Sequence, residues 1–99
     1  LGVSNFNAKQ FQELYDAAEI KPHNLQLECY FYMPEYEMVE LAKKLNVTFT
    51  SYGTLGSPGR SMFLPNVPWP EANPMEEPLV RRVAVKYKKT SAQVGVRKL

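Results

Sequence analysis

The sequence predicts an α/β fold in which parallel strands alternate with helices, and two observations carry this prediction. Three short apolar runs that end in polar residues begin 23 residues apart, at residues 1–6 (LGVSNF), 24–30 (NLQLECY) and 47–52 (VTFTSY). The stretches between them have the apolar spacing of amphipathic helices. Strand–helix–strand units of this kind usually form a barrel or an open sheet. Such sheets place their chemistry at the carboxyl ends of the strands, so the polar residues there are the first candidates for a site.

The first helix is expected to begin at Asn7, because Gln10 three residues later completes a capping box. Pro22 is expected to end this helix. Four apolar residues recur between them at helical spacing and form one face: Phe11, Leu14, Tyr15 and Ala18.

The second helix is expected after the second run, with Pro34 at a first helical position. Glu40 precedes Lys43 and Lys44 by three and four residues, which favours ion pairs on the helix surface. The third run is β-branched and aromatic, as strands are. The apolar stripe of the second helix comprises Met38, Leu41, Ala42 and Leu45.

The regular alternation stops at residues 53–72, which contain three glycines and four prolines. A long loop without regular structure is expected there, and such loops are often functional lids. Asn73, Pro74 and Glu76 then predict a further helix start. Thr90 and Gln93 form a second capping box, which predicts a short last helix.

The second half of the chain carries a basic cluster, since residues 81–99 hold seven Lys or Arg and no Asp or Glu. Such a cluster could contact the phosphates of nucleic acid. Its charges, however, are divided between two expected helices and interleaved with their apolar faces. This arrangement favours a solvated protein surface, and we expect no nucleic-acid partner.

The 99 residues correspond to about one small domain. The single cysteine, Cys29, excludes an internal disulfide and suits a reducing compartment; we expect it to be a small buried hydrophobe. No apolar run approaches the ~20 residues of a membrane span, and no leader precedes the fold. We therefore expect a cytoplasmic protein without a membrane partner. No spacing of metal ligands is visible, so no metal site is expected.

Four segments, in order, resemble the aldo-keto reductase family: LGVSNFN, KPHNLQLECYFY, VTFTSYGTLGSPGR and KKTSAQVGVR. The resemblance implies a (β/α)8 TIM barrel, with strands five to seven of that barrel in this chain. Residues 1–99 would then be a partial barrel domain, and residues 53–72 its long cofactor and substrate loop. Both ends of the sequence look like the interior of a larger domain.

The resemblance also implies an enzyme that reduces small aldehydes or ketones to alcohols with NADPH. In the family a tyrosine, aided by lysine, histidine and aspartate, supplies the proton, and these groups come from earlier strands. No catalytic residue is therefore expected among these 99 residues, and the isolated chain is expected to be inactive.

Four residues match the positions that hold the nicotinamide in the family. Ser4, Asn5 and Gln26 match the groups that hydrogen-bond the carboxamide, and Tyr52 matches the tyrosine that stacks on the ring. A carboxamide has two donors and an acceptor, so binding all of them fixes which ring face meets the substrate. A flat aromatic side chain suits a flat heteroaromatic ring.

A second group matches the loop that covers the cofactor pyrophosphate: Leu55, Gly56 and Ser57. Its backbone N–H groups and serine hydroxyl would face the phosphates, and small residues allow the close approach that this requires.

The chain departs from the family pattern at several positions. Leu25 stands where the family has Asn, Tyr30-Phe31 where it has His-Pro, and Gly53-Thr54 where it has Ser-Pro, which removes one hydroxyl contact to phosphate. Gly95 replaces a leucine of a helix core, which predicts weaker helix formation by ~1 kcal/mol relative to Ala and lost apolar packing.

Simpler interpretations of the same residues remain open. Ser4 and Asn5 could end a strand and cap a helix, Gln26 could be a satisfied core amide, and Tyr52 could be an ordinary strand aromatic. A second function class also remains, a non-catalytic binding or assembly module that keeps the fold. In it the basic helices or residues 59–72 would meet a partner.

Overall fold

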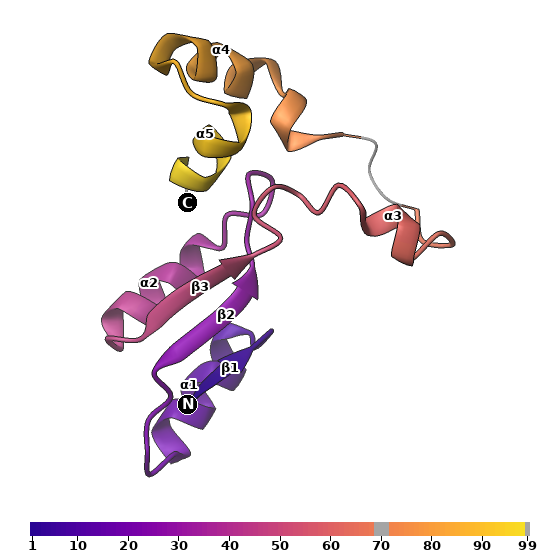
Figure 1. The fold of residues 1–99 in the computed structure, drawn as a ribbon. Helices are drawn as coiled ribbons and strands as arrows, with labels where there is room; N and C mark the ends of the chain where they lie inside the picture. The colour runs from indigo at the N-terminus through magenta and orange to yellow at the C-terminus, as the bar shows by residue number, and fades with distance from the viewer. Residues whose placement is uncertain (69–71, 99) are drawn as a thin grey trace. The chain divides into compact units, whose positions relative to one another are not determined.

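The computed structural model describes residues 1–68 and 72–98, which form two compact units. One unit comprises Leu1–Cys29 and Glu35–Tyr52, and the other comprises Tyr30–Pro34 and Gly53–Leu99. The first unit holds a sheet and two helices, and the second holds the remaining helices (Figure 1).

The first unit is built on a parallel sheet, as the sequence predicts. Strands β1 (Gly2–Ser4), β2 (Asn24–Glu28) and β3 (Thr48–Tyr52) lie in the order β1-β2-β3. Each strand is shorter than the apolar run that predicted it. Gly2 allows β1 to approach β2 closely, because a Cβ at this position would lie 2.8 Å from the carbonyl oxygen of Asn24.

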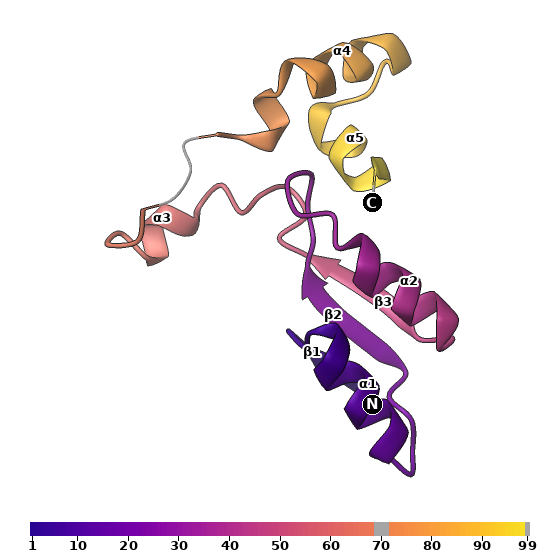
Figure 2. The same ribbon diagram turned by 180° about the vertical axis from the view of Figure 1, so that it is seen from behind.

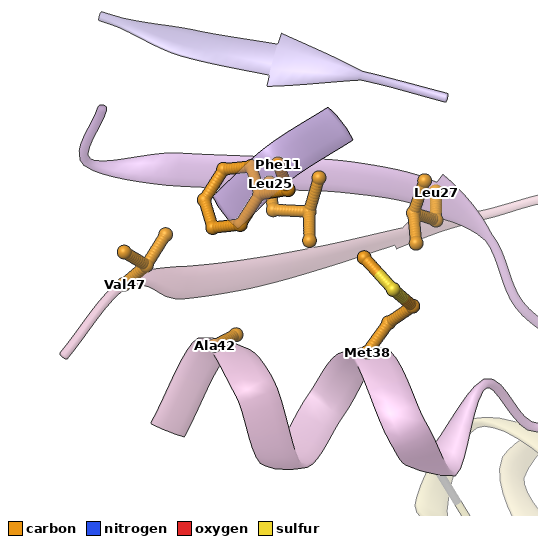
Figure 3. Close-up of a cluster of buried hydrophobic side chains, with 6 residues drawn as sticks. All are labelled: Phe11, Leu25, Leu27, Met38, Ala42 and Val47. Atoms are coloured by element: carbon orange, nitrogen blue, oxygen red, sulfur yellow. The ribbon is translucent and has the colours of Figure 1, made fainter. Parts of the chain in front are cut away.

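Helices α1 (Ala8–Ala17) and α2 (Tyr36–Lys44) lie on the same face of this sheet (Figure 2). They enclose one apolar cluster, drawn in Figure 3, whose buried members come from all parts of the unit: Phe11, Leu25, Leu27, Met38, Ala42 and Val47. Full burial of a large apolar side chain contributes about 1.5–3 kcal/mol, so this cluster is the main source of stability in the unit.

Helix α1 begins as predicted but ends earlier. Asn7 and Gln10 exchange hydrogen bonds of 3.0 and 2.8 Å, which form the expected capping box. The helix ends at Ala17, so the prediction that Pro22 stops it is wrong. The Lys21 ammonium donates to the Tyr15 carbonyl at 2.6 Å and satisfies a carbonyl of the last turn before the proline is reached.

Helix α2 begins later than predicted. Glu35 is its N-cap residue, in the left-handed conformation with φ 50°, so Pro34 lies before the helix and not at its first position. The predicted surface pair is confirmed at Glu40 and Lys43, whose charged atoms are 2.8 Å apart. Both side chains are exposed, so the pair adds at most about 0.5 kcal/mol.

The second unit contains α3 (Arg60–Phe63), the 3-10 helix η1 (Pro74–Glu76), α4 (Pro78–Tyr87) and α5 (Ser91–Lys98). The expectation that residues 53–72 lack regular structure is wrong at α3, a single turn closed by the Leu64 N–H on the Arg60 carbonyl at 3.1 Å. Residues 69–71 of that segment lie outside the described residues.

The helix predicted from Asn73 onward is divided in two. Asn73 caps as expected, since its Oδ1 accepts from the Met75 N–H at 3.0 Å, but the element it opens is the short η1. Pro78 begins α4 because it lacks the N–H that a continuous helix would need. The second capping box is confirmed: the Thr90 N–H and the Gln93 N–H donate to each other's side chains at 2.9 and 3.1 Å.

Gly95 is buried in α5, and the packing expected to be lost there is supplied by another residue. A Cβ at Gly95 would lie 2.9 Å from the terminal methyl carbon of Met75. The flexible methionine therefore fills the space that a larger side chain would take.

Among the described residues, no helix combines the length and the apolar character that crossing a bilayer requires.

Candidate functional site

The sheet of the first unit has one apolar and one polar face. Because strand side chains alternate and Leu25 and Leu27 are buried against the helices, the side chains between them point to the opposite face. The strand register places Ser4 beside Gln26 and Gln26 beside Thr50 on that face, and all three are exposed. This face therefore offers hydroxyl and amide groups.

Asn5 lies directly after β1, at the carboxyl end of the sheet. Its backbone is left-handed, with φ 60°, a conformation that asparagine tolerates better than most residues. Its N–H donates to the Gln26 carbonyl at 3.0 Å. The turn therefore holds the Asn5 backbone against the neighbouring strand β2.

Tyr52 ends β3 and reaches across the sheet to Asn5. Its hydroxyl donates to Asn5 Oδ1 at 2.7 Å, although β1 and β3 both pair with β2 and not with each other. Its own carbonyl accepts from the Cys29 N–H at 3.1 Å. Its side chain is 38% exposed, so part of the ring remains accessible.

The structure thus brings together the four residues that match the nicotinamide positions: Ser4, Asn5 and Tyr52 at the carboxyl ends of β1 and β3, and Gln26 in the middle of β2. Ser4 and Gln26 are register neighbours, the Asn5 N–H binds the Gln26 carbonyl, and the Tyr52 hydroxyl binds Asn5. The hydrogen bond between Tyr52 and Asn5 is not visible in the sequence, because it joins residues 47 positions apart.

The residues that match the pyrophosphate loop lie in the second unit, where they line a pocket of about 250 Å³. Gly56 has φ 83° and Ser57 has φ 49°, so the loop turns sharply there. The Gly56 N–H donates to the Gly53 carbonyl at 2.8 Å, so this donor is used within the turn. Other lining residues come from both sides of the loop: Tyr30, Tyr32, Pro58, Arg60, Ser61, Ala72, Asn73 and Pro74.

Arg60 is a lining residue that the sequence reasoning missed. Among the described residues that line this pocket, it alone carries a formal charge, and it lies three residues after Ser57 in the LGSPGR segment. A cation beside a sharp, glycine-containing turn is a signal of anion binding that the sequence already contained.

Two side chains, one in each unit, have shifted pKa values. Tyr32 donates its hydroxyl hydrogen to the carboxylate of Glu77, and this bond raises the pKa of Tyr32 to about 12, because ionisation would remove the bond and add a second negative charge. Burial raises the pKa of the Cys29 thiol. Cys29 is only 2% exposed, so its prediction as a small buried hydrophobe is confirmed.

In residues 1–68 and 72–98, no group of three or more His, Cys, Asp or Glu side chains is placed to hold a metal ion.

Comparison with known proteins agrees with the resemblance seen in the sequence. The family model described as "Aldo/keto reductase family" matches residues 1–94. The chain is 40% identical over 97 residues to "Aldo-keto reductase family 1 member A1-A" of Danio rerio, covering 98% of this chain and 29% of that protein. It is 37% identical over 97 residues to "Aldo-keto reductase family 1 member A1" of Gallus gallus, covering 98% and 28%.

A solved structure is similar in fold as well as in sequence. The aldose reductase from Schistosoma japonicum superposes with a TM-score of 0.74 at 34% identity, over 94% of this chain and 26% of that chain. The chain therefore spans less than a third of the length of the relatives that it matches.

Proposed function

The chain belongs to the aldo/keto reductase family, and on this premise we propose that it forms part of an oxidoreductase that reduces aldehydes or ketones with NADPH. In this proposal residues 1–99 are one partial (β/α)8 barrel domain that supplies strands five to seven. Residues 53–72 form its cofactor and substrate loop. The cytoplasm is the proposed location, because the single cysteine suits a reducing compartment.

The observation that carries the proposal is the grouping of Ser4, Asn5 and Tyr52, at the carboxyl ends of β1 and β3, with Gln26 of the strand between them. Two amides and a hydroxyl can satisfy both the donors and the acceptor of a carboxamide. The partly exposed Tyr52 ring offers a flat surface for the nicotinamide ring. These residues fit the nicotinamide group, and NADPH, when bound, supplies the hydride for reduction.

The proposed role of these residues is orientation of the cofactor. Carboxamide contacts from Asn5 and Gln26 fix which face of the ring is turned to a carbonyl substrate. In the second unit, Leu55, Gly56 and Ser57 form the proposed pyrophosphate loop, and Arg60 offers a positive charge at the same pocket. The proton donor is proposed to come from residues outside these 99.

A chimeric barrel tests this proposal. The 97 aligned residues of the Danio rerio relative are replaced by those of this chain, and NADPH binding is followed by quenching of protein fluorescence. We expect the folded chimera to bind NADPH, and Gln26→Ala to weaken binding about fivefold through loss of one to two hydrogen bonds. Gln12→Ala is the matched control, because the Gln12 side chain donates to Asp16 on α1, away from the candidate site. A chimera with a native circular-dichroism spectrum that does not quench with NADPH, or equal effects of the two substitutions, would overturn the proposal.

The isolated 99-residue chain provides a second test. Mixed with NADPH and an aldehyde, it is expected to leave the NADPH absorbance unchanged, because the proton donor is absent. Aldehyde-dependent loss of that absorbance would show that these residues suffice for catalysis.

A non-catalytic binding or assembly module is the second candidate function. An apolar groove of about 520 Å³ on α4 and α5 favours it, lined by Leu79, Val83, Tyr87 and Val94 with Lys89 and Arg97 among its basic lining residues. A folded chimera that does not bind NADPH would favour this candidate over the reductase.

A further inference from the structure

A hydrogen bond joins Tyr52 and Asn5, which have different roles in the proposed cofactor site. The Tyr52 ring would stack on the nicotinamide, and the Asn5 amide would bind its carboxamide. We propose that Tyr52 is also a positioning residue, whose hydroxyl holds the Asn5 amide in one orientation. The identity of the ligand rests on the proposed function. The positioning of Asn5 by Tyr52 rests on the geometry of the first unit.

The backbone of Asn5 is fixed, so its side-chain torsions are the remaining freedom. The left-handed φ of 60° and the 3.0 Å bond from its N–H to the Gln26 carbonyl hold it at the end of β1. Two residues later the capping box at Asn7 fixes the start of α1. An amide on such a fixed backbone can still turn over and exchange its oxygen for its nitrogen.

In the structure the Tyr52 hydroxyl is paired with the oxygen end of this amide. It donates to Asn5 Oδ1 at 2.7 Å, so the oxygen is engaged and the NH2 group is the part of the amide left to recognise a ligand. An NH2 group recognises an acceptor, and in a nicotinamide that acceptor is the carboxamide oxygen.

Tyr52 is itself held well enough to act in this way. Its carbonyl accepts from the Cys29 N–H at 3.1 Å, and its strand position pairs with Glu28. With backbone and hydroxyl both anchored, the ring has little freedom to rotate away. The same bond therefore orders the ring face and the amide before a cofactor arrives, which lowers the entropic cost of binding.

A double-mutant cycle in the chimeric barrel tests the link. Tyr52→Phe keeps the ring and removes the hydroxyl, and we expect it to weaken NADPH binding about fivefold. In an Asn5→Ala background the same substitution is expected to change the affinity by less than about twofold, because the group that it positions is gone. Tyr15→Phe is the matched control: its hydroxyl lies 3.4 Å from the Leu45 carbonyl on the helical side of the unit, and no change in affinity is expected. An equal effect of Tyr52→Phe in both backgrounds, or no effect in either, would overturn the inference.

A measurement without cofactor separates this inference from the proposed function. In protein labelled with 15N-asparagine, Tyr52→Phe is expected to shift the side-chain NH2 resonances of Asn5 and to leave those of Asn46 in place. The spectra are recorded both for the chimera and for the 99-residue chain. Unshifted Asn5 resonances count against the inference, whereas shifted resonances in a protein that does not bind NADPH count against the proposed function alone.

Discussion

Gly56 and Gly59 lie three residues apart in one loop, but only one of them needs to be glycine. Gly56 has φ 83°, and a Cβ there would lie 2.8 Å from the Pro74 ring. Gly59 has φ −91°, and a Cβ there would meet nothing within 4 Å. In this loop, therefore, the backbone conformation requires glycine at position 56 and does not require it at position 59.

Gly56→Ala is expected to lower the free energy of unfolding by about 2 kcal/mol, from the left-handed backbone and the contact with Pro74 together. Gly59→Ala is expected to change it by less than about 0.5 kcal/mol. Urea denaturation of both variants measures the difference. Similar losses at the two positions would contradict the role assigned to Gly56.

The hydrogen bond between Tyr32 and Glu77 can be followed through the pKa of Tyr32. The Glu77 carboxylate raises the pKa of Tyr32 to about 12, so Glu77→Gln is expected to lower that pKa towards the ordinary value of about 10. Glu76→Gln, which alters the neighbouring glutamate near Arg81, is expected to leave it unchanged. Ultraviolet difference spectra across alkaline pH follow the phenolate directly. A Tyr32 pKa that is unchanged by Glu77→Gln would refute the pairing.

The same shift has a consequence for stability. The unfolded chain releases this phenolic proton near pH 10, before the folded chain does, so it binds fewer protons than the fold in that range. The contribution of Tyr32 to the free energy of unfolding is therefore complete below about pH 10 and is lost as the pH rises towards 12.

At the scale of elements, the starts of α1 and α5 depend on a short-range exchange of hydrogen bonds. Each capping box satisfies two backbone N–H groups at the start of its helix. One box joins Asn7 and Gln10, and the other joins Thr90 and Gln93. Both could be predicted because every participating group lies within four residues of the helix start.

Asn7→Ala is expected to cost about 1 kcal/mol of unfolding free energy, since the Gln10 N–H loses its partner. Asn7→Asp keeps an acceptor and adds a negative charge at a helix amino end, so its stability is expected to equal or exceed that of the native chain. Thermal and urea unfolding compare the two. A loss with aspartate as large as that with alanine would show that the cap contributes little.

The helix limits that were predicted wrongly lie where the sequence offers competing local signals. Pro34 and Asn73 both carry local helix-start signals, but Glu35 in a left-handed conformation and Pro78 set where α2 and α4 begin. At the end of α1, the Tyr15 carbonyl accepts from the Lys21 ammonium, a contact that no helix signal in the sequence indicates. In the candidate site, the residue types and the parallel strands followed from the sequence. The bond between Tyr52 and Asn5 did not, because it requires the strand order and the register.

At the scale of the whole chain, the sheet leaves hydrogen-bonding groups without strand partners. In the part of the chain that the structure describes, β1 and β3 each pair with β2 alone. Unpaired strand edges invite pairing with other chains. In the proposed complete barrel, neighbouring strands would cover both edges.

The 99-residue chain alone is therefore expected to associate as its concentration rises and to unfold over a broad range. Sedimentation velocity at several concentrations and a urea titration measure both properties. The chimeric barrel is the control, and it is expected to show less association and a sharper transition. A monomeric 99-residue chain with one sharp transition would show that the two edges are tolerated.

Cys29, directly after β2, carries the single thiol, which can report how often its surroundings open. Cys29 is buried, its N–H is bonded to the Tyr52 carbonyl, and burial keeps its thiol protonated to higher pH than usual. A thiol reagent can reach it only when the residues that cover it move apart, so the rate of labelling measures local opening around Cys29. One native residue thus reports on the same junction of strands that carries the proposed cofactor contacts, without any engineered probe.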